Sequence, residues 1–269
     1  MIARDLELAI GLCAERAGLR VDPEKPYLLE NRLAPVARRE GFGSVEEMMA
    51  AVRDRDEDRL IWAIVEAMSP SESSFFGDPE TFELIAEKVL PALAHRRDSG
   101  PIRVWAAACG TGQEIYSLAM LLAEHPPAGT TVELTGSDIC ERRLEKAQSG
   151  LYSQFEVQRG LSAHRLVRHF ENAEDGFVLS PRLRQQVRWR RLNPIEDLRR
   201  LGQFDLVLCR NLAAALTELA RERLLANLTA ALAPGGFLVL GRGERAAGLS
   251  SPQGLPGFHV RANAQRAAA

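Results

Sequence analysis

The chain has 269 residues, with 34 Lys and Arg against 36 Asp and Glu, and 46% of its residues are hydrophobic. These proportions are typical of a folded globular protein and exclude disordered, collagen-like and disulfide-stapled classes. The near balance of charge argues against a nucleic-acid-binding protein. No apolar stretch reaches the roughly 18 residues of a membrane span. The charged N-terminus, MIARDLELAI, differs from a signal peptide, so we expect a cytoplasmic location and no membrane insertion.

The first part of the chain shows only helical periodicity. Four amphipathic helices are expected, over residues 5–17, 27–39, 44–52 and 58–68. Pro35 lies inside the second of these, where a proline is expected to kink or shorten a helix. Ser44 followed by Glu47 has the spacing of a capping box, which marks the start of the third helix. The pattern predicts a small helical bundle.

The motif SPSESSFFGD, residues 69–78, then interrupts the helical pattern. It resembles a linker, yet it carries Phe75 and Phe76, whose simplest role is to fill a groove. Asp78 and Pro79 have the types expected at an N-cap and at the first turn, so a helix towards Leu93 should follow.

From Ile102 the pattern changes to short apolar runs that alternate with helical segments. Strands are expected at IRVWAA, TVELTG, FDLVLC, FLVLG and GFHVRA, with helices at 113–124, 141–148 and 217–232. This alternation predicts a parallel sheet covered on both faces. Between Tyr152 and Asn193 the alternation lapses, and FVLSPRLRQQVRWRRL there predicts two short strands in an antiparallel insert.

The four cysteines (Cys13, Cys109, Cys140 and Cys209) lie far apart in the sequence. No CxxC or Cys/His spacing typical of a metal site accompanies them. We therefore expect reduced thiols and no metal centre.

A glycine turn follows the first expected strand, in VWAAACGTGQEIYSLAM. Gly110 and Gly112 let backbone amides approach a ligand closely, and the N-terminus of the next helix adds a positive dipole end. Ile115 stands where a dinucleotide-binding GxGxxG motif has its third glycine. The turn therefore favours a cofactor without phosphates.

Two acids lie beside this turn, and each has two possible roles. Glu114 either stabilises the helix dipole or contacts a cofactor. Asp138 ends the second strand, where an acid typically binds ribose hydroxyls, although it could equally cap the helix that begins near Glu141. Together with the glycines, a ribose-binding acid favours S-adenosylmethionine.

A third polar pair, Arg210 and Asn211, directly follows the strand FDLVLC. Parallel strands end at one edge of the sheet, so these side chains should reach the same crevice. The alternative is an arginine that only ties down the end of the sheet through a salt bridge.

The chain resembles the chemotaxis receptor methyltransferase (CheR) family from about Leu6 to Glu244. The matching pieces are YLLENRLA, SESSFFGD, WAAACGTGQEIYSLAM, SDI with its continuation to Tyr152, RLNP, FDLVLCRN, LAPGG and GRGE. The resemblance implies an α/β fold in which an all-α domain precedes a Rossmann-like class I methyltransferase domain with a small antiparallel insert. The expected divisions are a helical domain at 1–68, a linker at 69–78, and a cofactor-binding domain at 79–269 with the insert at about 153–193.

The resemblance also implies the reaction and the cofactor contacts. Family members use S-adenosylmethionine to methyl-esterify glutamates on chemoreceptor helices, with S-adenosylhomocysteine as the product. The positions that match family cofactor contacts are Ser71, Ser73, Glu114, Asp138, Asn193, Arg210 and Asn211, in addition to Gly110 and Gly112 of the turn. Ser71 and Ser73 replace the usual Asn and Thr, and Pro194 replaces the usual Leu after Asn193.

The catalytic side departs from the family pattern at three places. The linker arginine of the family is Gly77 here, the tyrosine that follows CRN is Ala215, and family GHSE reads GRGE. A glutamate acceptor is already ionised at neutral pH and needs no general base, so such losses slow the reaction without abolishing it in principle. Arg242, within GRGE, is a candidate replacement for the lost arginine.

Two hypotheses of different classes therefore stay open. One is a protein-glutamate methyltransferase, and the other is a non-catalytic relative that binds S-adenosylmethionine or its product for regulation. A methyltransferase for small molecules is disfavoured because the helical domain and linker are retained. Arg32, Arg38 and Arg39 form the candidate contact to acidic receptor helices, the alternative being a solvated helix face.

Overall fold

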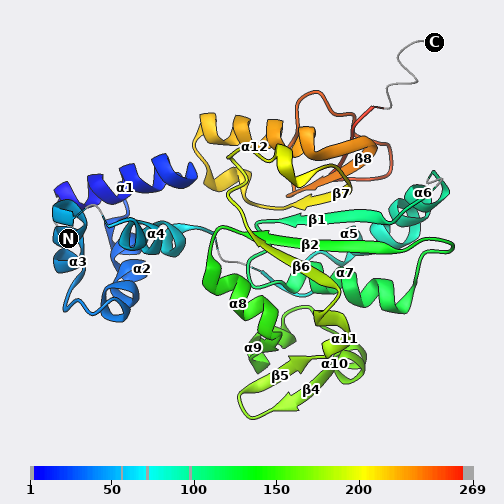
Figure 1. Cartoon of the computed structure of the whole chain (residues 1–269), viewed down its shortest axis with the longest axis horizontal. Helices are drawn as coiled ribbons and strands as arrows, with labels where there is room; N and C mark the ends of the chain where they lie inside the picture. The colour runs from blue at the N-terminus through cyan, green and yellow to red at the C-terminus, as the bar shows by residue number, and fades with distance from the viewer. Residues whose placement is uncertain (1–2, 56, 71–72, 97–98, 263–269) are drawn as a thin grey trace. The chain divides into compact units, whose positions relative to one another are not determined.

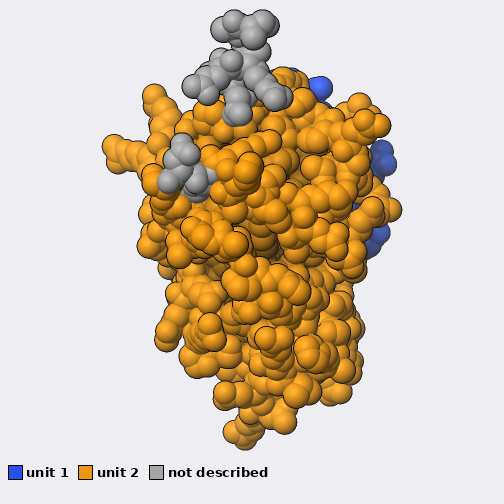
Figure 2. Space-filling view, turned by 90° about the vertical axis from the view of Figure 1, so that its right-hand side faces the viewer, with its two compact units in different colours: residues 1–70, 213–224 blue, residues 71–212, 225–269 orange. Residues whose placement is uncertain are grey.

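The computed structural model describes residues 3–55, 57–70, 73–96 and 99–262, which form two compact units (Figures 1 and 2). Residues 1–70 and 213–224 form the first, called the helical unit here. Residues 71–212 and 225–269 form the second, the α/β unit, one face of which fills Figure 2. No helix within the described ranges is long and apolar enough to cross a membrane.

The helical unit contains the four expected helices. Their bounds are α1 Ala3–Ala17, α2 Pro26–Arg39, α3 Val45–Arg55 and α4 Asp58–Met68. Apolar faces pack together in its core, where Cys13, Leu33, Met48 and Ile64 are fully buried. Pro35 lies inside α2, which continues to Arg39, so of the two predicted effects, a kink or a shorter helix, the shortening did not occur. The proline is exposed, and the loss of one backbone donor there leaves the rest of the helix intact.

A segment distant in sequence completes this unit. It holds the 3₁₀ helix Ala213–Ala215 and the beginning of α12, Glu218–Ala231. The backbone N–H of Arg20 donates to the carbonyl of Ala215 at 2.8 Å, and that of Thr217 donates to Gly18 at 2.8 Å. The sequence division did not include this segment, because pairing between distant backbones leaves no local pattern.

The α/β unit is built on a six-stranded sheet in the order β6-β2-β1-β7-β8-β9. The strands are β1 Ile102–Ala107, β2 Val132–Asp138, β6 Val187–Arg191, β7 Phe204–Cys209, β8 Leu232–Leu240 and β9 Phe258–Val260. The first five are parallel, and β9 pairs antiparallel to β8. The expected Rossmann-like α/β class is confirmed. After β1 the chain adds β2 and then β6 on one side of β1, and it later adds β7 and β8 on the opposite side of β1. The topological switch point therefore lies between β1 and β7.

Helices precede the first strand of this sheet and connect the later strands. They are α5 Pro79–Leu84, a π-helical segment Ile85–Val89, α6 Leu90–His95, α7 Gln113–Glu124 and α8 Glu141–Ser149, followed later by a 3₁₀ turn at Arg199–Leu201 and by α12. The helices expected at 113–124 and 141–148 are confirmed. Asp78 is the N-cap residue of α5, but its side chain makes no capping hydrogen bond.

The antiparallel insert is a separate three-stranded sheet in the order β3-β5-β4, seen at the lower end of Figure 1. It comprises β3 Leu151–Tyr152, α9 Gln154–Gln158, α10 Ala163–His169, β4 Phe170–Ala173 and β5 Gly176–Leu179. The sequence also placed VRWRRL in this insert, which is wrong. After α11, Pro181–Arg184, the chain returns to the main sheet, where β6 pairs parallel to β2. An edge strand with exposed arginines shows the same alternation in either sheet, so the pattern could not distinguish them.

Both linker phenylalanines are buried in the α/β unit. The Phe75 ring meets Tyr152 and Phe170 edge to face, at centroid distances of 5.0 and 5.6 Å. Phe76 packs on Phe82, and its backbone N–H donates to the hydroxyl of Ser117 at 2.9 Å. These two residues therefore connect the linker to the insert, to α5 and to α7.

Candidate functional site

Most of the expected cofactor residues lie at one edge of the main sheet. They follow the carboxyl ends of β1 (Gly110, Gly112 and Glu114), β2 (Asp138), β6 (Asn193) and β7 (Arg210 and Asn211). Ligands of open α/β sheets bind at this edge, beside the switch point. Ser73 of the linker joins them, since its Cβ lies 3.4 Å from the position of a Cβ on Gly110. Ser71 lies outside the described residues.

The turn after β1 bends sharply at left-handed backbone conformations. Gly110 and Gly112 have φ of 57° and 89°, and Ala108 has φ of 52°. A Cβ on Gly112 would lie 2.9 Å from Ala147 Cβ and 3.0 Å from Trp189 Cη2. A side chain at position 112 would therefore disrupt the packing of the turn. Gly110 lies beside Ser73 of the linker, at the edge of the crevice.

Asp138 joins two strand ends through its carboxylate. Its Oδ2 accepts from the Gly110 N–H at 2.9 Å, and its Oδ1 accepts from the Cys140 N–H at 2.9 Å. The guanidinium of Arg143 lies 3.7 Å from Oδ1. The predicted alternative of a helix cap is wrong, because Cys140 is the N-cap residue of α8 and no side chain in the described ranges caps this helix. The carboxylate instead connects the glycine turn to the backbone just before α8. Oδ2, which accepts one hydrogen bond, keeps a further lone pair for a ligand hydroxyl.

A second polar cluster links β7, α7 and the linker. Arg210 donates through Nη1 to Glu114 Oε1 at 3.1 Å and through Nη2 to Asp78 Oδ2 at 3.3 Å. Asp78 Oδ2 also accepts from the Thr81 hydroxyl at 3.0 Å. Arg210 thus forms salt bridges, as the structural alternative expected, but it forms them with groups that border the crevice.

Burial changes the acidity of both crevice acids. It raises the pKa of Glu114 above its usual range, and the nearby Arg210 opposes this rise. Burial also raises the pKa of Asp138, opposed by Arg143 and by the backbone donors of Cys140 and Gly110. Both carboxylates therefore gain a proton at a higher pH than exposed acids do.

Asn193 and Asn211 occupy different surroundings. Asn193 is buried beside Asp138, whose carbonyl accepts from the Leu192 N–H at 3.1 Å, and its amide donates to Glu196 at 3.1 Å. Asn211 is exposed with φ of 64°, and its N–H donates to Glu244 Oε2 at 3.3 Å. Both are placed at the carboxyl edge, as predicted, but only Asn193 is enclosed.

The positions that depart from the family pattern are spread over both units. Gly77 is exposed in the turn before α5. Ala215 belongs to the helical unit, where its carbonyl accepts from Arg20. Arg242 is exposed in the turn after β8.

The family description "CheR methyltransferase, SAM binding domain" matches residues 71–253. The chain belongs to the CheR methyltransferase family. It is 32% identical over 241 residues to "Chemotaxis protein methyltransferase 1" of Vibrio cholerae, covering 87% of this chain and 86% of that protein. It is 31% identical over 246 residues to the protein of the same name from Pseudomonas aeruginosa, covering 89% of both. Among solved structures, the chain is similar to PKMT2 from Rickettsia typhi in complex with AdoHcy, with a TM-score of 0.39 and 16% sequence identity. The match covers 63% of this chain and 26% of the PKMT2 chain.

The charges of this CheR crevice suit the cofactor of the family, S-adenosylmethionine. Three carboxylates, of Asp78, Glu114 and Asp138, face two guanidinium groups, of Arg143 and Arg210. S-adenosylmethionine carries one net positive charge, which suits a crevice that contains several carboxylates. The free lone pair of Asp138 Oδ2 suits a ribose hydroxyl, and no phosphate-binding glycine is needed.

Three contributors to this CheR site were missed in the sequence. Asp78 was assigned only to a helix cap, Glu244 only to the GRGE motif, and Tyr152 only to a matching segment. The Glu244 carboxylate accepts from the N–H groups of Gly241 and Asn211, and the Tyr152 hydroxyl donates to the Thr111 carbonyl at 2.6 Å. The bonds of Tyr152 to Thr111 and of Asn211 to Glu244 join segments distant in the sequence, so only the presence of these residues in family motifs could have drawn attention to them.

The hydrogen bond from the Tyr152 hydroxyl to the Thr111 carbonyl connects the insert to the glycine turn, so its loss should affect cofactor binding. We expect Tyr152→Phe to weaken S-adenosylmethionine binding about three- to tenfold, since one hydrogen bond contributes about 0.5–1.5 kcal/mol. The ring contacts with Phe75 and Phe170 stay, so the fold should persist. Calorimetric titration checks this, with Tyr27→Phe on exposed α2 as the control. Equal affinities in both variants would contradict the role of this hydroxyl.

The raised pKa values of Glu114 and Asp138 predict a pH dependence of cofactor binding. Both acids bind a cationic, hydroxyl-rich ligand best when ionised, so affinity should be constant near neutrality and fall as the pH drops through their raised pKa values. The fall should begin above the pH of about 4 at which ordinary carboxyls titrate. Dissociation constants measured from neutral to mildly acidic pH test this, and Glu114→Gln should flatten part of the curve. A constant affinity down to about pH 4 would refute the prediction.

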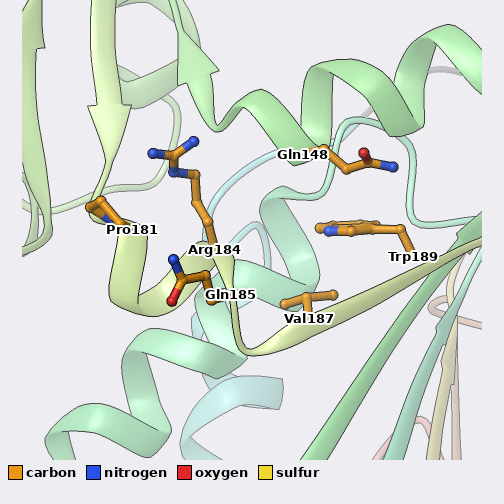
Figure 3. Close-up of a pocket in the computed structure, with 6 residues that line it drawn as sticks. All are labelled: Gln148, Pro181, Arg184, Gln185, Val187 and Trp189. Carbon is orange, nitrogen blue, oxygen red and sulfur yellow. The ribbon is translucent and has the colours of Figure 1, made fainter.

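A separate pocket of about 230 Å³ lies between α8, α11 and β6 (Figure 3). Gln148, Pro181, Arg184, Gln185, Val187 and Trp189 line it. None of the expected cofactor residues is among them. Trp189 nevertheless connects the two regions, because its ring also packs beneath Gly112 and Gly136.

Proposed function

We propose that this CheR protein uses S-adenosylmethionine to methylate glutamate carboxylates on chemoreceptor helices. The observation that carries the proposal is the contact between the Asp138 carboxylate and the Gly110 N–H, with the Glu114–Arg210 pair beside it at the switch point. The names of the relatives, which are chemotaxis protein methyltransferases, support the same conclusion. The cytoplasmic location expected from the sequence is part of this proposal.

The cofactor would be held by the residues gathered at the carboxyl edge: Ser73, Gly110, Glu114, Asp138, Asn193, Arg210 and Asn211, with the sequence adding Ser71. Bound S-adenosylmethionine supplies a methyl group activated by its sulfonium and becomes S-adenosylhomocysteine. The acceptor glutamate is already ionised, so the protein moves no proton. Its residues contribute alignment of the two reactants and exclusion of water.

For the partner, we propose that exposed arginines of α2 meet acidic receptor helices. Arg38 is exposed, while Arg32 donates to the carbonyl of Met68 at 3.1 Å and Arg39 is paired with Glu40 at 2.9 Å. Arg39 is therefore partly neutralised, and Arg38 is the strongest candidate of the three. Tyr27 and Leu28 add exposed apolar surface to the same helix.

A second candidate function is that of a regulatory protein that binds S-adenosylmethionine or its product without turnover. The observation that favours it is the replacement of two family residues by Gly77 and Ala215. Side chains this small cannot orient an acceptor carboxylate, whereas the cofactor side of the crevice is retained.

Two measurements separate these functions. Purified protein is titrated with S-adenosylmethionine by calorimetry and then assayed for transfer of labelled methyl groups to receptor-containing membranes. Transfer in base-labile ester form supports the proposed reaction, and binding without transfer supports the regulatory alternative. Absence of binding would refute both. The double variant Gly77→Arg and Ala215→Tyr provides a further comparison, since a gain of transfer would show that activity was lost with these two side chains.

A further inference from the structure

We propose that Arg242 binds the acceptor carboxylate and selects an anionic side chain as the methyl acceptor. This inference rests on the proposed function and adds to it the residue that recognises the substrate. Two features of the molecule support this role: the turn after β8 is held at the crevice, and the guanidinium groups beside the crevice acids are already paired.

The turn that carries Arg242 is fixed against the end of β7. Glu244 Oε2 accepts from the Gly241 N–H at 2.7 Å and from the Asn211 N–H at 3.3 Å. Gly241 is buried so tightly that a Cβ would lie 2.7 Å from Glu244 Oε2 and 2.9 Å from Asn211 N. Since Asn211 follows Arg210, the turn stands at the rim of the cofactor crevice.

The two arginines beside the crevice acids already have carboxylate partners. Arg210 is held by Glu114 and Asp78, and Arg143 lies 3.7 Å from Asp138. A second carboxylate approaching either group would compete with the existing carboxylate partner and be repelled by it.

Arg242 differs from these arginines because it forms no ion pair within the described part of the chain, and it is exposed. A guanidinium group binds a carboxylate through two parallel hydrogen bonds, which fixes both the position and the orientation of the acceptor oxygen. The reaction requires such orientation, because the methyl group moves to an oxygen held in line with it. Arg242 is thus available to hold an incoming carboxylate at the rim of the crevice.

The same turn offers a matched control. Arg245 is also exposed, lies three residues further on, and likewise forms no ion pair among the residues that the structure describes. Arg245→Ala removes the same charge from the same turn. Comparison of Arg242→Ala with Arg245→Ala therefore separates a specific contact from a general loss of positive charge.

The test measures binding of the acceptor and does not depend on turnover. Full-length protein saturated with S-adenosylhomocysteine is titrated with two chemoreceptor fragments that differ only by Glu or Gln at the methyl-accepting position. The wild type should bind the Glu fragment about tenfold or more tightly, consistent with a charge-assisted pair. Arg242→Ala should abolish this preference, Arg242→Lys should restore part of it, and Arg245→Ala should keep it. S-adenosylmethionine affinity should stay within about twofold in all variants.

Three results would overturn the inference: a wild type that binds neither fragment, a wild type without preference for Glu, and an Arg242→Ala variant that keeps the preference. Failure of the proposed function gives a different result. In that case the wild type transfers no labelled methyl group to the Glu fragment, although it binds this fragment through Arg242.

Discussion

Replacement of Asp138 by asparagine is expected to weaken S-adenosylmethionine binding by about 100-fold or more. Hydrogen bonds to a charged group contribute about 1.5–3 kcal/mol each, and a ribose offers two hydroxyl donors to this carboxylate. The amide also fails to serve both backbone donors, because its NH₂ group must face the N–H of either Gly110 or Cys140. The variant therefore loses the ribose contacts and disturbs the glycine turn.

Calorimetric titration measures this loss, with Asp205→Asn as the matched control. Asp205 also accepts from a backbone N–H, that of Arg103 at 2.8 Å, but it lies near the beginning of β7, away from the crevice. Thermal unfolding of both variants separates lost binding from lost folding. If Asp138→Asn binds the cofactor as tightly as Asp205→Asn does, the assignment of the crevice fails.

The second large effect is expected at Gly160, in the connection between α9 and α10. Its φ is 92°, and a Cβ there would overlap the carbonyl oxygen of Phe75 in the linker. Gly160→Ala must therefore displace backbone and not only a flexible side chain. Alanine in this left-handed conformation costs about 1–2 kcal/mol. Together with the overlap, we expect the free energy of unfolding to fall by more than about 3 kcal/mol in total.

Urea unfolding followed by tryptophan fluorescence measures this effect. Gly129→Ala is the control, because Gly129 also has a positive φ of 73° but nothing lies within 4 Å of its Cβ position. The control should lose only about 1–2 kcal/mol, so the difference between the variants reports the overlap with Phe75. Equal unfolding midpoints would show that the insert and the linker are not closely packed.

The sequence predicted those elements whose pattern is local. β1, β7 and α7 have the bounds expected for them, because buried parallel strands are continuous apolar runs and α7 follows a glycine turn. The carboxyl ends of these strands could be inferred as well, since parallel strands end at one edge. The sequence therefore predicted that Gly110, Asp138 and Arg210 lie close together.

Features that depend on distant partners could not be predicted. β6 has the alternation of any edge strand, so its membership in the main sheet became visible only in its pairing with β2. The bonds of Asp78 to Arg210 and of Glu244 to Asn211 join residues 132 and 33 positions apart. Nothing in the local types of Asp78 or Glu244 identifies those partners, because a carboxylate near a helix start or in a turn has many common uses.

The pairing of Gly18–Arg20 with Ala215–Thr217 bears on how this protein can be divided. A cut after residue 70 would produce a C-terminal fragment whose stretch 213–217 has lost its backbone partners, in the loop directly after Arg210 and Asn211. Truncations and gene fusions that treat the first seventy residues as a removable module would therefore damage the region that they are meant to isolate. The two units are interleaved along the chain, so this protein is best produced as one intact chain.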